Sequence, residues 1–273
     1  MNRPSKPSTG LPATLAHLPT PALRDAVAQA YATFRQRGPL TAPLDVCLGC
    51  CCPVEIEREL REWPLAQLTT QHFYEYNTAA KGLTQPLAEV RRLLPRLLEL
   101  VAAGEEVHHS TELYLCRLGR CPEDAWSAQE RLVLDRFAAA YFDAVLRSGA
   151  SGGALQIGFD DPLSVLLMFD IGGIAVDPLL ELWLRCEDPG STIQFVDSTS
   201  MWFWDEHEVG NAFAEDRPDF RARLREWLLD PSTRACFAAK MREPAFLERA
   251  DLEPAGRAPF DVMVTEVLAH LTR

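Results

Sequence analysis

The sequence contains no apolar run close to the roughly 18 residues that a membrane-spanning helix requires. Its first segment, residues 1–19, has no apolar stretch of the kind found in secretory signals. We therefore predict no membrane span, no export and a cytoplasmic location. In that reducing compartment the eight cysteines are expected to remain thiols rather than to form a disulfide framework.

Positive charge is also scarce. The chain has 27 Lys and Arg residues against 39 Asp and Glu residues, which gives a net charge of −12 at pH 7. Nucleic-acid binding depends on basic patches that neutralise phosphates, so this balance argues against a nucleic-acid partner. The same balance suits a protein partner with a basic surface.

Fingerprints of common enzymes are missing as well. The glycine-rich segment 148–153 lacks the GxxxxGK[ST] spacing of a phosphate-binding loop, and a linker accounts for it better. His108 and His109 are adjacent, whereas the HExxH motif places two ligands on one helical face. No nucleophile can be paired with His207 from the sequence. These gaps favour a non-catalytic protein and leave a hydrolase using His207 or His108 with nearby acids as a third hypothesis.

The most unusual segment present is residues 44–63, LDVCLGCCCPVEIERELREW, which combines a cysteine cluster with a predicted helix start. Pro53 suits the first helical position, and Glu55 suits the positive end of the helix dipole. Because that end also stabilises thiolates, we predict lowered pKa values for Cys50 to Cys52. Within this segment, one stretch of six residues holds four of the eight cysteines: Cys47, Cys50, Cys51 and Cys52.

Three interpretations of this segment compete. In the first, Cys47 and Cys50 form a CxxC pair that binds zinc, which prefers four ligands. The sequence has no second CxxC pair, so Cys116 and Cys121 are the best candidates to complete the site. Nearby histidines offer further ligands: His72, His108 and His109.

The second interpretation is a redox dithiol, as in thioredoxin-like proteins, although those place the CxxC motif after a strand. No such strand is evident here. The third interpretation is that the thiols are small, partly buried side chains packed at a helix end, since free cysteine is among the most buried residue types.

The hydrophobic pattern predicts helices throughout, and no alternating strand pattern exceeds four residues. We therefore expect an all-α fold of ten to twelve short antiparallel helices, arranged as an irregular α-solenoid or a helical bundle. No fixed-period repeat is present. Helix starts are predicted where a capping side chain precedes Pro or pairs with Glu or Gln: Thr20-Pro21, Thr69 or Thr70, Ser127 with Glu130, Asp161-Pro162, Asp177-Pro178, Ser191 with Gln194, and Asp230-Pro231.

Composition also suggests how the chain is divided. Residues 1–18 are rich in Pro, Ser and Thr and are predicted to be a disordered tail. An N-terminal helical half, 19–148, and a C-terminal helical half, 154–273, then flank the linker, unless they form one continuous domain.

A second unusual stretch, residues 201–213, combines aromatic and acidic side chains. Such a combination is typical of a patch that binds a partner protein, because tryptophan is common in binding hot spots. Alternatively, Trp202 and Phe203 belong to the core and the acidic run is a solvated loop. The predicted partner-binding residues are Trp202, Trp204, Asp205, Glu206 and His207.

Four segments, CLGCCCP, WPLAQLT, LLPRLLELV and FWDEHEVGNAF, give the chain a resemblance to a known family. From about residue 44 to 245 it resembles uncharacterised bacterial all-helical proteins with a cysteine-rich segment and no assigned activity. The resemblance implies an all-α fold in which both unusual stretches belong to one design. It implies no catalytic residue.

The leading hypothesis is a non-catalytic protein-binding module, and a toxin-neutralising protein of the immunity type is one concrete form of it. The alternative, from a different class, is a metal-binding or thiol-redox protein centred on residues 47–52, with zinc as the expected metal.

Overall fold

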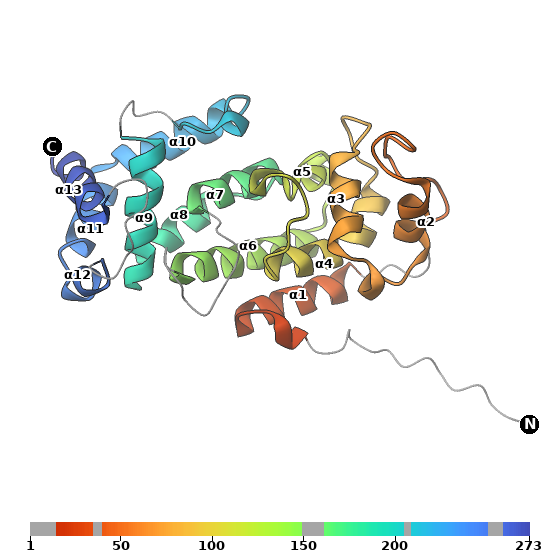
Figure 1. The fold of residues 1–273 in the computed structure, drawn as a ribbon, viewed down its shortest axis with the longest axis horizontal. Helices are drawn as coiled ribbons and strands as arrows, with labels where there is room; N and C mark the ends of the chain where they lie inside the picture. The colour runs from red at the N-terminus through yellow and green to blue at the C-terminus, as the bar shows by residue number, and fades with distance from the viewer. Residues whose placement is uncertain (1–14, 35–39, 149–160, 205–208, 251–258) are drawn as a thin grey trace, which may run out of the picture.

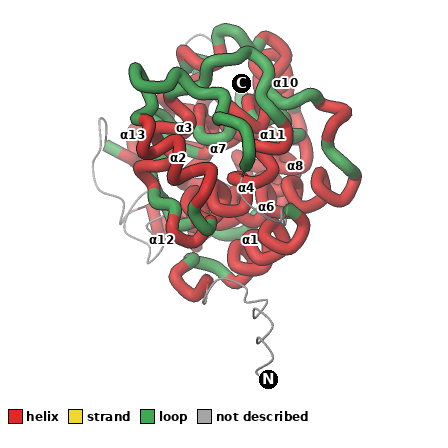
Figure 2. Tube along the Cα trace, turned by 90° about the vertical axis from the view of Figure 1, so that its right-hand side faces the viewer, coloured by secondary structure: helices red, strands yellow, loops and turns green. Residues whose placement is uncertain are grey.

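The computed structural model describes residues 15–34, 40–148, 161–204, 209–250 and 259–273. Over these ranges the fold is all-α, as predicted, with thirteen α-helices, five short 3-10 helices and no strand (Figures 1 and 2). The α-helices are α1 (Pro21–Thr33), α2 (Val54–Glu62), α3 (Thr70–Thr78), α4 (Leu87–Ala102), α5 (Cys116–Gly119), α6 (Ala128–Ser148), α7 (Pro162–Ile171), α8 (Asp177–Arg185), α9 (Pro189–Trp202), α10 (Pro218–Leu229), α11 (Pro231–Lys240), α12 (Pro244–Ala250) and α13 (Phe260–Leu271). The 3-10 helices are η1 (Leu15–His17), η2 (Leu65–Gln67), η3 (Thr111–Leu113), η4 (Glu123–Ala125) and η5 (Ala212–Ala214).

Most of the predicted helix starts are confirmed, because capping depends on a few neighbouring residues. The Thr20, Asp161 and Asp230 side chains each accept a hydrogen bond from a backbone N–H in the first turn that follows. A capping box also opens α6, where the Ser127 N–H donates to the Glu130 carboxylate and the Glu130 N–H donates to Ser127 Oγ.

Two predicted caps are wrong. Helix α8 begins at Asp177 itself, with Val176 at the cap position. Helix α9 begins at Pro189, and Asp188 caps it through the Gly190 N–H at 2.8 Å. Ser191 therefore lies inside the first turn of α9. Helices α8 and α9 therefore begin one and three residues earlier than their predicted caps imply.

The segment after His109 forms two short pieces, η3 and α5, rather than one continuous helix. The break coincides with Glu112 in η3, whose buried carboxylate accepts hydrogen bonds from Ser164 Oγ at 2.9 Å and Asn211 Nδ2 at 2.6 Å. These long-range contacts fix a turn that local helix propensity does not predict.

The helices build an elongated molecule around α6, the longest of them. Helices α2 and α3 lie at one end, and α11, α12 and α13 lie at the other (Figure 1). Helix α6 packs against α1 on one side and against α7, α8 and α9 further along, while α1 also packs against α4. Helix α9 in turn packs against α12 and α13.

One hydrophobic core contains buried residues from both predicted halves. Phe142 of α6 meets Trp183 of α8 with ring centroids 5.7 Å apart, and Trp183 packs on Phe195 of α9 at 5.9 Å. The predicted linker, residues 148–153, lies outside the described residues after Ser148. Aromatic packing therefore joins α6 directly to the helices beyond the linker.

The predicted tail, residues 1–18, is wrong over its last four residues. Leu15–His17 form η1, and the Leu18 side chain is buried in the core. Residues 1–14 lie outside the described part of the chain.

A close approach between α5 and α7 requires glycine at position 119. A methyl group there would overlap the Ile171 carbonyl oxygen, which is a backbone atom that cannot turn away. We predict that Gly119→Ala lowers the free energy of unfolding by about 2–4 kcal/mol. Gly49→Ala is the matched control, because its Cβ would meet nothing and only the backbone φ of +76° is strained, at a cost of roughly 1 kcal/mol. Equal losses in urea unfolding would contradict the steric argument.

Candidate metal centre

The cysteine segment forms a loop that is pinned to the chain following α3. The Cys47 N–H donates to the Ala79 carbonyl at 2.8 Å, and Val46 forms an antiparallel bridge with Ala80. The Asp45 carboxylate accepts from the Gly82 N–H at 2.9 Å. The base of the loop is therefore held by both backbone and side-chain hydrogen bonds.

Within the loop a tight turn gathers the thiols. The Cys47 carbonyl accepts from the N–H groups of Cys51, at 3.1 Å, and Cys52, at 3.0 Å. Gly49 adopts a φ of +76°, in the left-handed region that favours glycine, and its N–H donates to the Cys52 carbonyl. Because the chain reverses within these residues, Cys50 and Cys51 return toward Cys47.

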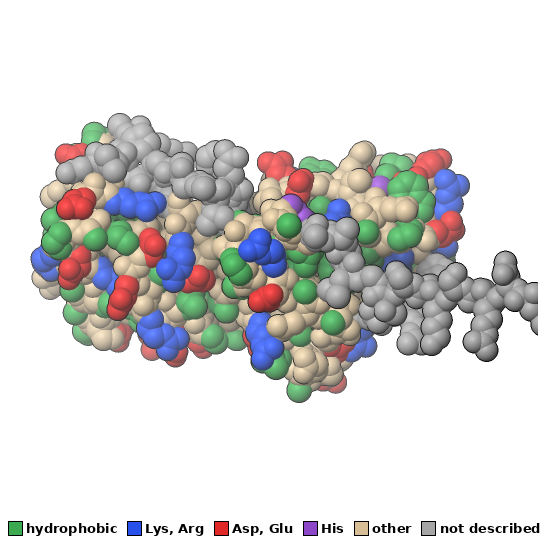
Figure 3. Space-filling view, turned by 90° about the horizontal axis from the view of Figure 1, so that it is seen from below, with side chains coloured by type: hydrophobic (Ala, Val, Ile, Leu, Met, Phe, Trp, Pro, Cys, Tyr) green, Lys and Arg blue, Asp and Glu red, His purple; other side chains and the backbone are tan. Residues whose placement is uncertain are grey.

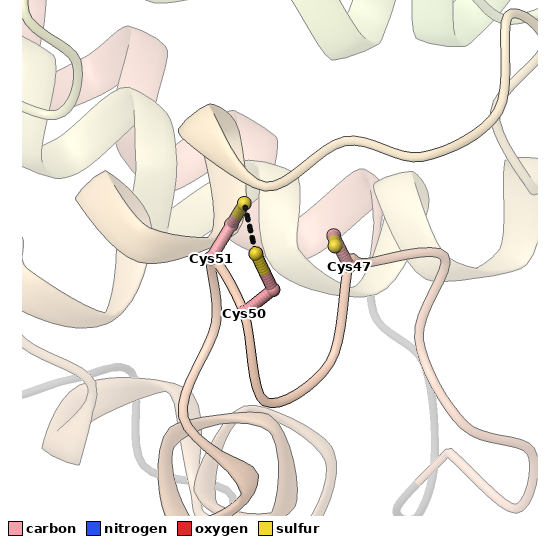
Figure 4. A group of neighbouring side chains, drawn as sticks. All are labelled: Cys47, Cys50 and Cys51. Atoms are coloured by element: carbon pink, nitrogen blue, oxygen red, sulfur yellow. Dashed lines mark hydrogen bonds between the residues drawn. The ribbon is translucent and has the colours of Figure 1, made fainter.

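The result is a group of three sulfur atoms, from Cys47, Cys50 and Cys51, that all lie within 4.8 Å of one another (Figure 4). The sulfurs of Cys50 and Cys51 are 3.7 Å apart. Zinc–sulfur bonds of about 2.3 Å in a tetrahedron give sulfur–sulfur separations near 3.8 Å, so one metal ion can reach all three sulfurs. Cys50 and Cys51 are exposed and Cys47 is half-buried, so the group is open to solvent.

The predicted four-cysteine ligand set is therefore wrong in composition. Cys47 and Cys50 do come together, but their third neighbour is Cys51 rather than Cys116 or Cys121. Both of those cysteines are buried, and the Cys121 thiol donates to the Arg117 carbonyl at 3.6 Å. Cys116 begins α5, which packs against α7, and Cys121 follows the end of α5 by two residues; both side chains are buried.

Cys52 also stays outside the group. Its side chain is fully buried and its thiol donates to the Pro53 carbonyl at 3.7 Å. Helix α2 begins at Val54, with Pro53 at the cap position, one residue later than predicted. Cys52 thus fulfils the interpretation of a thiol packed at a helix end.

The predicted lowering of thiol pKa is wrong for Cys51 and Cys52. Hydrogen bonding with the Cys50 thiol, and then with Cys47, raises the pKa of Cys51 to about 11. Burial raises the pKa of Cys52 to about 11. Neighbouring thiols and burial therefore act against the thiolate that was expected at this helix start.

A buried arginine that the sequence did not single out supports the loop. Arg117 is 1% exposed, and its guanidinium lies 3.6 Å from the centre of the Tyr76 ring. It donates to the Asp45 carbonyl at 3.1 Å, and it pairs with Glu89 at 3.3 Å. It also donates to Gln85 Oε1 and to the Tyr76 carbonyl. A lone arginine in a helical segment carries no local signal of this role.

Glu89 completes the connection between Arg117 and the loop. Its second carboxylate oxygen accepts from the Asp45 N–H at 2.9 Å, next to the cysteines in sequence. Burial raises the pKa of the Glu89 carboxyl, while the Asp45 N–H and the positive charge of Arg117 act in the opposite direction. The loop is thus tied through Asp45 to α4 and α5.

The histidines considered as ligands have structural partners instead. His72 completes the capping box of α3 with Thr69, and its Nε2 lies 2.9 Å from the Glu59 carboxylate of α2. His108 is buried, and its Nδ1 accepts from the His109 N–H at 2.9 Å. Among the described residues, no His, Asp or Glu joins the three-cysteine group.

The predicted partner-binding stretch lies only in part within the described residues. Trp204 is 4% exposed and stacks on the His270 ring at a centroid distance of 5.3 Å, so its predicted role in a surface patch is wrong. Phe203 is buried beside it, in agreement with the alternative that the aromatics belong to the core. Asp205, Glu206 and His207 lie outside the described residues, as does the side chain of Trp202.

The comparisons add no relative. No family model, curated protein or solved structure matches the chain. The resemblance to bacterial helical proteins therefore stays a proposal. No helix in the described ranges has the length and apolar character needed to cross a bilayer.

Loss of Arg117 should destabilise the fold, because Glu89 would remain buried without its cation. We predict that Arg117→Met lowers the free energy of unfolding by about 3–5 kcal/mol. Arg147→Met, which removes an exposed ion pair with Asp143, should change it by less than about 1 kcal/mol. Adding Glu89→Gln to Arg117→Met should recover about 1–3 kcal/mol in a double-mutant cycle. Strictly additive losses in denaturant unfolding would refute the coupling.

His108 should make stability fall at mildly acidic pH. Burial lowers its pKa from 6.5 to about 4, so between these values the unfolded chain binds a proton that the native chain does not. Stability is therefore lost as the pH falls through this window, by about 1–3 kcal/mol.

In urea unfolding at pH 7 and pH 4.5, His108→Gln should reduce the difference between the two pH values. The exposed neighbour provides the control, since His109→Gln should retain most of that difference. An unchanged pH dependence in His108→Gln would show that other groups cause it.

Proposed function

We propose that the protein binds a thiophilic metal ion through Cys47, Cys50 and Cys51. The observation that carries this proposal is the convergence of the three sulfurs within 4.8 Å of one another. Thiolate ligands select soft ions such as Cu(I) and Zn(II) over Mg(II) or Ca(II). A loop built from so few residues offers little else to a ligand than its sulfur atoms.

The rigid support of the loop strengthens this proposal. Three thiols on a mobile chain must lose conformational entropy before they can share one ion. Here the Gly49 turn and the hydrogen bonds of Asp45 hold the loop in the shape that brings the sulfurs together.

Protein binding remains a second proposal, and the exposed side chains that favour it lie in the same loop. Leu48 is 50% exposed and Val54 is 54% exposed, so two large apolar side chains flank the thiols. On the face seen in Figure 3, basic and acidic side chains are interspersed rather than gathered into one acidic patch. The predicted match to a basic partner, as in an immunity-type protein, therefore gains no support from this face.

The other predictions stand apart from this site. A hydrolase based on His108 is disfavoured because that side chain is buried and its Nδ1 is occupied by the His109 N–H. The cytoplasmic location and the absence of a nucleic-acid partner stay predictions. A thiol-redox role at the same cysteines is separated from metal binding by the experiment below.

Metal content tests the proposal directly. Protein purified under reducing conditions without chelator, or titrated with Zn(II) or Cu(I), should bind about one ion per chain. Cys50→Ser and Cys51→Ser should each weaken binding by at least about tenfold, because each removes one of three ligands. Cys236→Ser is the matched control, since this half-buried thiol lies on α11, outside the group.

Two outcomes would contradict metal binding. Equal affinity in the Cys50→Ser variant and in Cys236→Ser would place the ion elsewhere. No binding of either ion, together with a disulfide among residues 47–51 after mild oxidation, would favour the redox role instead.

A further inference from the structure

The three-cysteine loop offers an ion three ligands and no more. Among the described residues, no fourth His, Cys, Asp or Glu has a ligand atom within 4.8 Å of all three sulfurs. The nearest cysteine in sequence, Cys52, is buried with its thiol directed to the Pro53 carbonyl. The number of protein ligands is therefore the property that should discriminate between metals.

Metal ions differ in the number of ligands that they require. Structural zinc is almost always held by four protein ligands in a tetrahedron, and a three-ligand zinc site keeps one position for water or substrate. Cu(I) is selected by soft thiolate ligands and tolerates a lower coordination number. Three thiolates on one loop can satisfy Cu(I) completely, whereas they leave Zn(II) one ligand short.

Charge acts in the opposite direction. Three bound thiolates carry three negative charges, which a divalent ion neutralises better than a monovalent one. The loop, however, is open: Cys50 and Cys51 are exposed, so water screens the residual charge. Screening weakens the electrostatic advantage of Zn(II), whereas the number of protein ligands stays at three at any ionic strength, so Zn(II) would need water as its fourth ligand.

Among the described residues, His72 cannot supply the fourth ligand without breaking existing contacts. His72 is held between the Thr69 cap and the Glu59 carboxylate, at 3.2 Å from the Thr69 N–H and 2.9 Å from Glu59. Moving it to the loop would open the start of α3. In the described part of the chain, a tetrahedral site therefore has no fourth protein ligand in place, and water from the open side of the loop would complete it.

We propose that the ion for this loop is Cu(I), bound by the sulfurs of Cys47, Cys50 and Cys51 alone. This inference rests on the proposed metal-binding function. Because two of the three sulfurs are exposed, the ion is also accessible to competing thiols, and the site suits exchange of Cu(I) rather than its permanent burial.

An anaerobic competition experiment tests the choice of ion. The whole chain, reduced and free of metal, is titrated with Cu(I) against the chelator bicinchoninate and with Zn(II) against a chromogenic zinc chelator. We expect one Cu(I) per chain, and we expect Cu(I) to displace bound Zn(II) while excess Zn(II) leaves Cu(I) in place. Sulfur-to-copper charge-transfer absorbance in the near ultraviolet reports the bonds, and X-ray absorption should count three sulfur neighbours.

Variants separate this inference from a general affinity for copper. Cys51→Ser should weaken Cu(I) binding by at least tenfold and reduce the sulfur count to two, and Cys236→Ser should change neither. Because Cys51 is exposed, circular dichroism should show the fold of Cys51→Ser to be unchanged. Cu(I) binding of equal strength in both variants would overturn the assignment.

The outcomes also distinguish the two levels of the proposal. Binding of neither ion would refute the metal-binding function itself. Tight one-to-one Zn(II) binding that Cu(I) cannot displace would keep that function and overturn the choice of Cu(I). Four sulfur neighbours in the copper-loaded protein would overturn the three-ligand site and point to a cysteine from a second chain.

Discussion

The fold of the N-terminal region depends on one buried cation. The Arg117 side chain is 1% exposed, and burying a guanidinium is unfavourable unless its charge and its hydrogen-bond donors find partners. Those partners come from three separate segments: Glu89 and Gln85 at α4, the Tyr76 ring and carbonyl at α3, and the Asp45 carbonyl at the cysteine loop. Removing any one partner leaves the others buried with an unbalanced charge or dipole. The Asp45 carbonyl thus joins Arg117 to the loop, whose base is also held by the hydrogen bonds of Cys47 and Asp45 to the chain after α3.

That constraint explains why exposed thiols can be well placed. Loops are usually the most mobile part of a fold, and thiols on them usually sample many arrangements. Here Asp45 is held through both its N–H and its carbonyl, by Glu89 and Arg117, two residues before the first cysteine. The Gly49 turn then sets the return of the chain. The placement of the exposed thiols thus depends in part on the buried ion pair of Arg117 and Glu89.

How well a feature could be predicted from the sequence depends on how far apart its interacting residues lie along the chain. Caps such as Asp161 and Asp230 act on a backbone N–H two or three residues away, so they were visible in the sequence. The helical class was visible for the same reason. Arg117 was not, because its partners lie 28 to 72 residues distant and nothing in its neighbours marks them. Trp204 was misassigned because an aromatic beside acidic residues looks the same in a sequence whether it faces solvent or the core.

The cysteine loop also contains both features that were visible in the sequence and features that depend on the folded geometry. Cys47 and Cys50 were visible in the sequence because their CxxC spacing is local. Cys116 and Cys121 were predicted only because a tetrahedral zinc site needs four ligands. The fold supplies Cys51 instead, because the left-handed Gly49 and the shared Cys47 carbonyl reverse the chain within five residues. The turn sets the number of converging sulfurs at three, so an ion bound there would meet three protein ligands, and that coordination number would limit which metal the loop could hold.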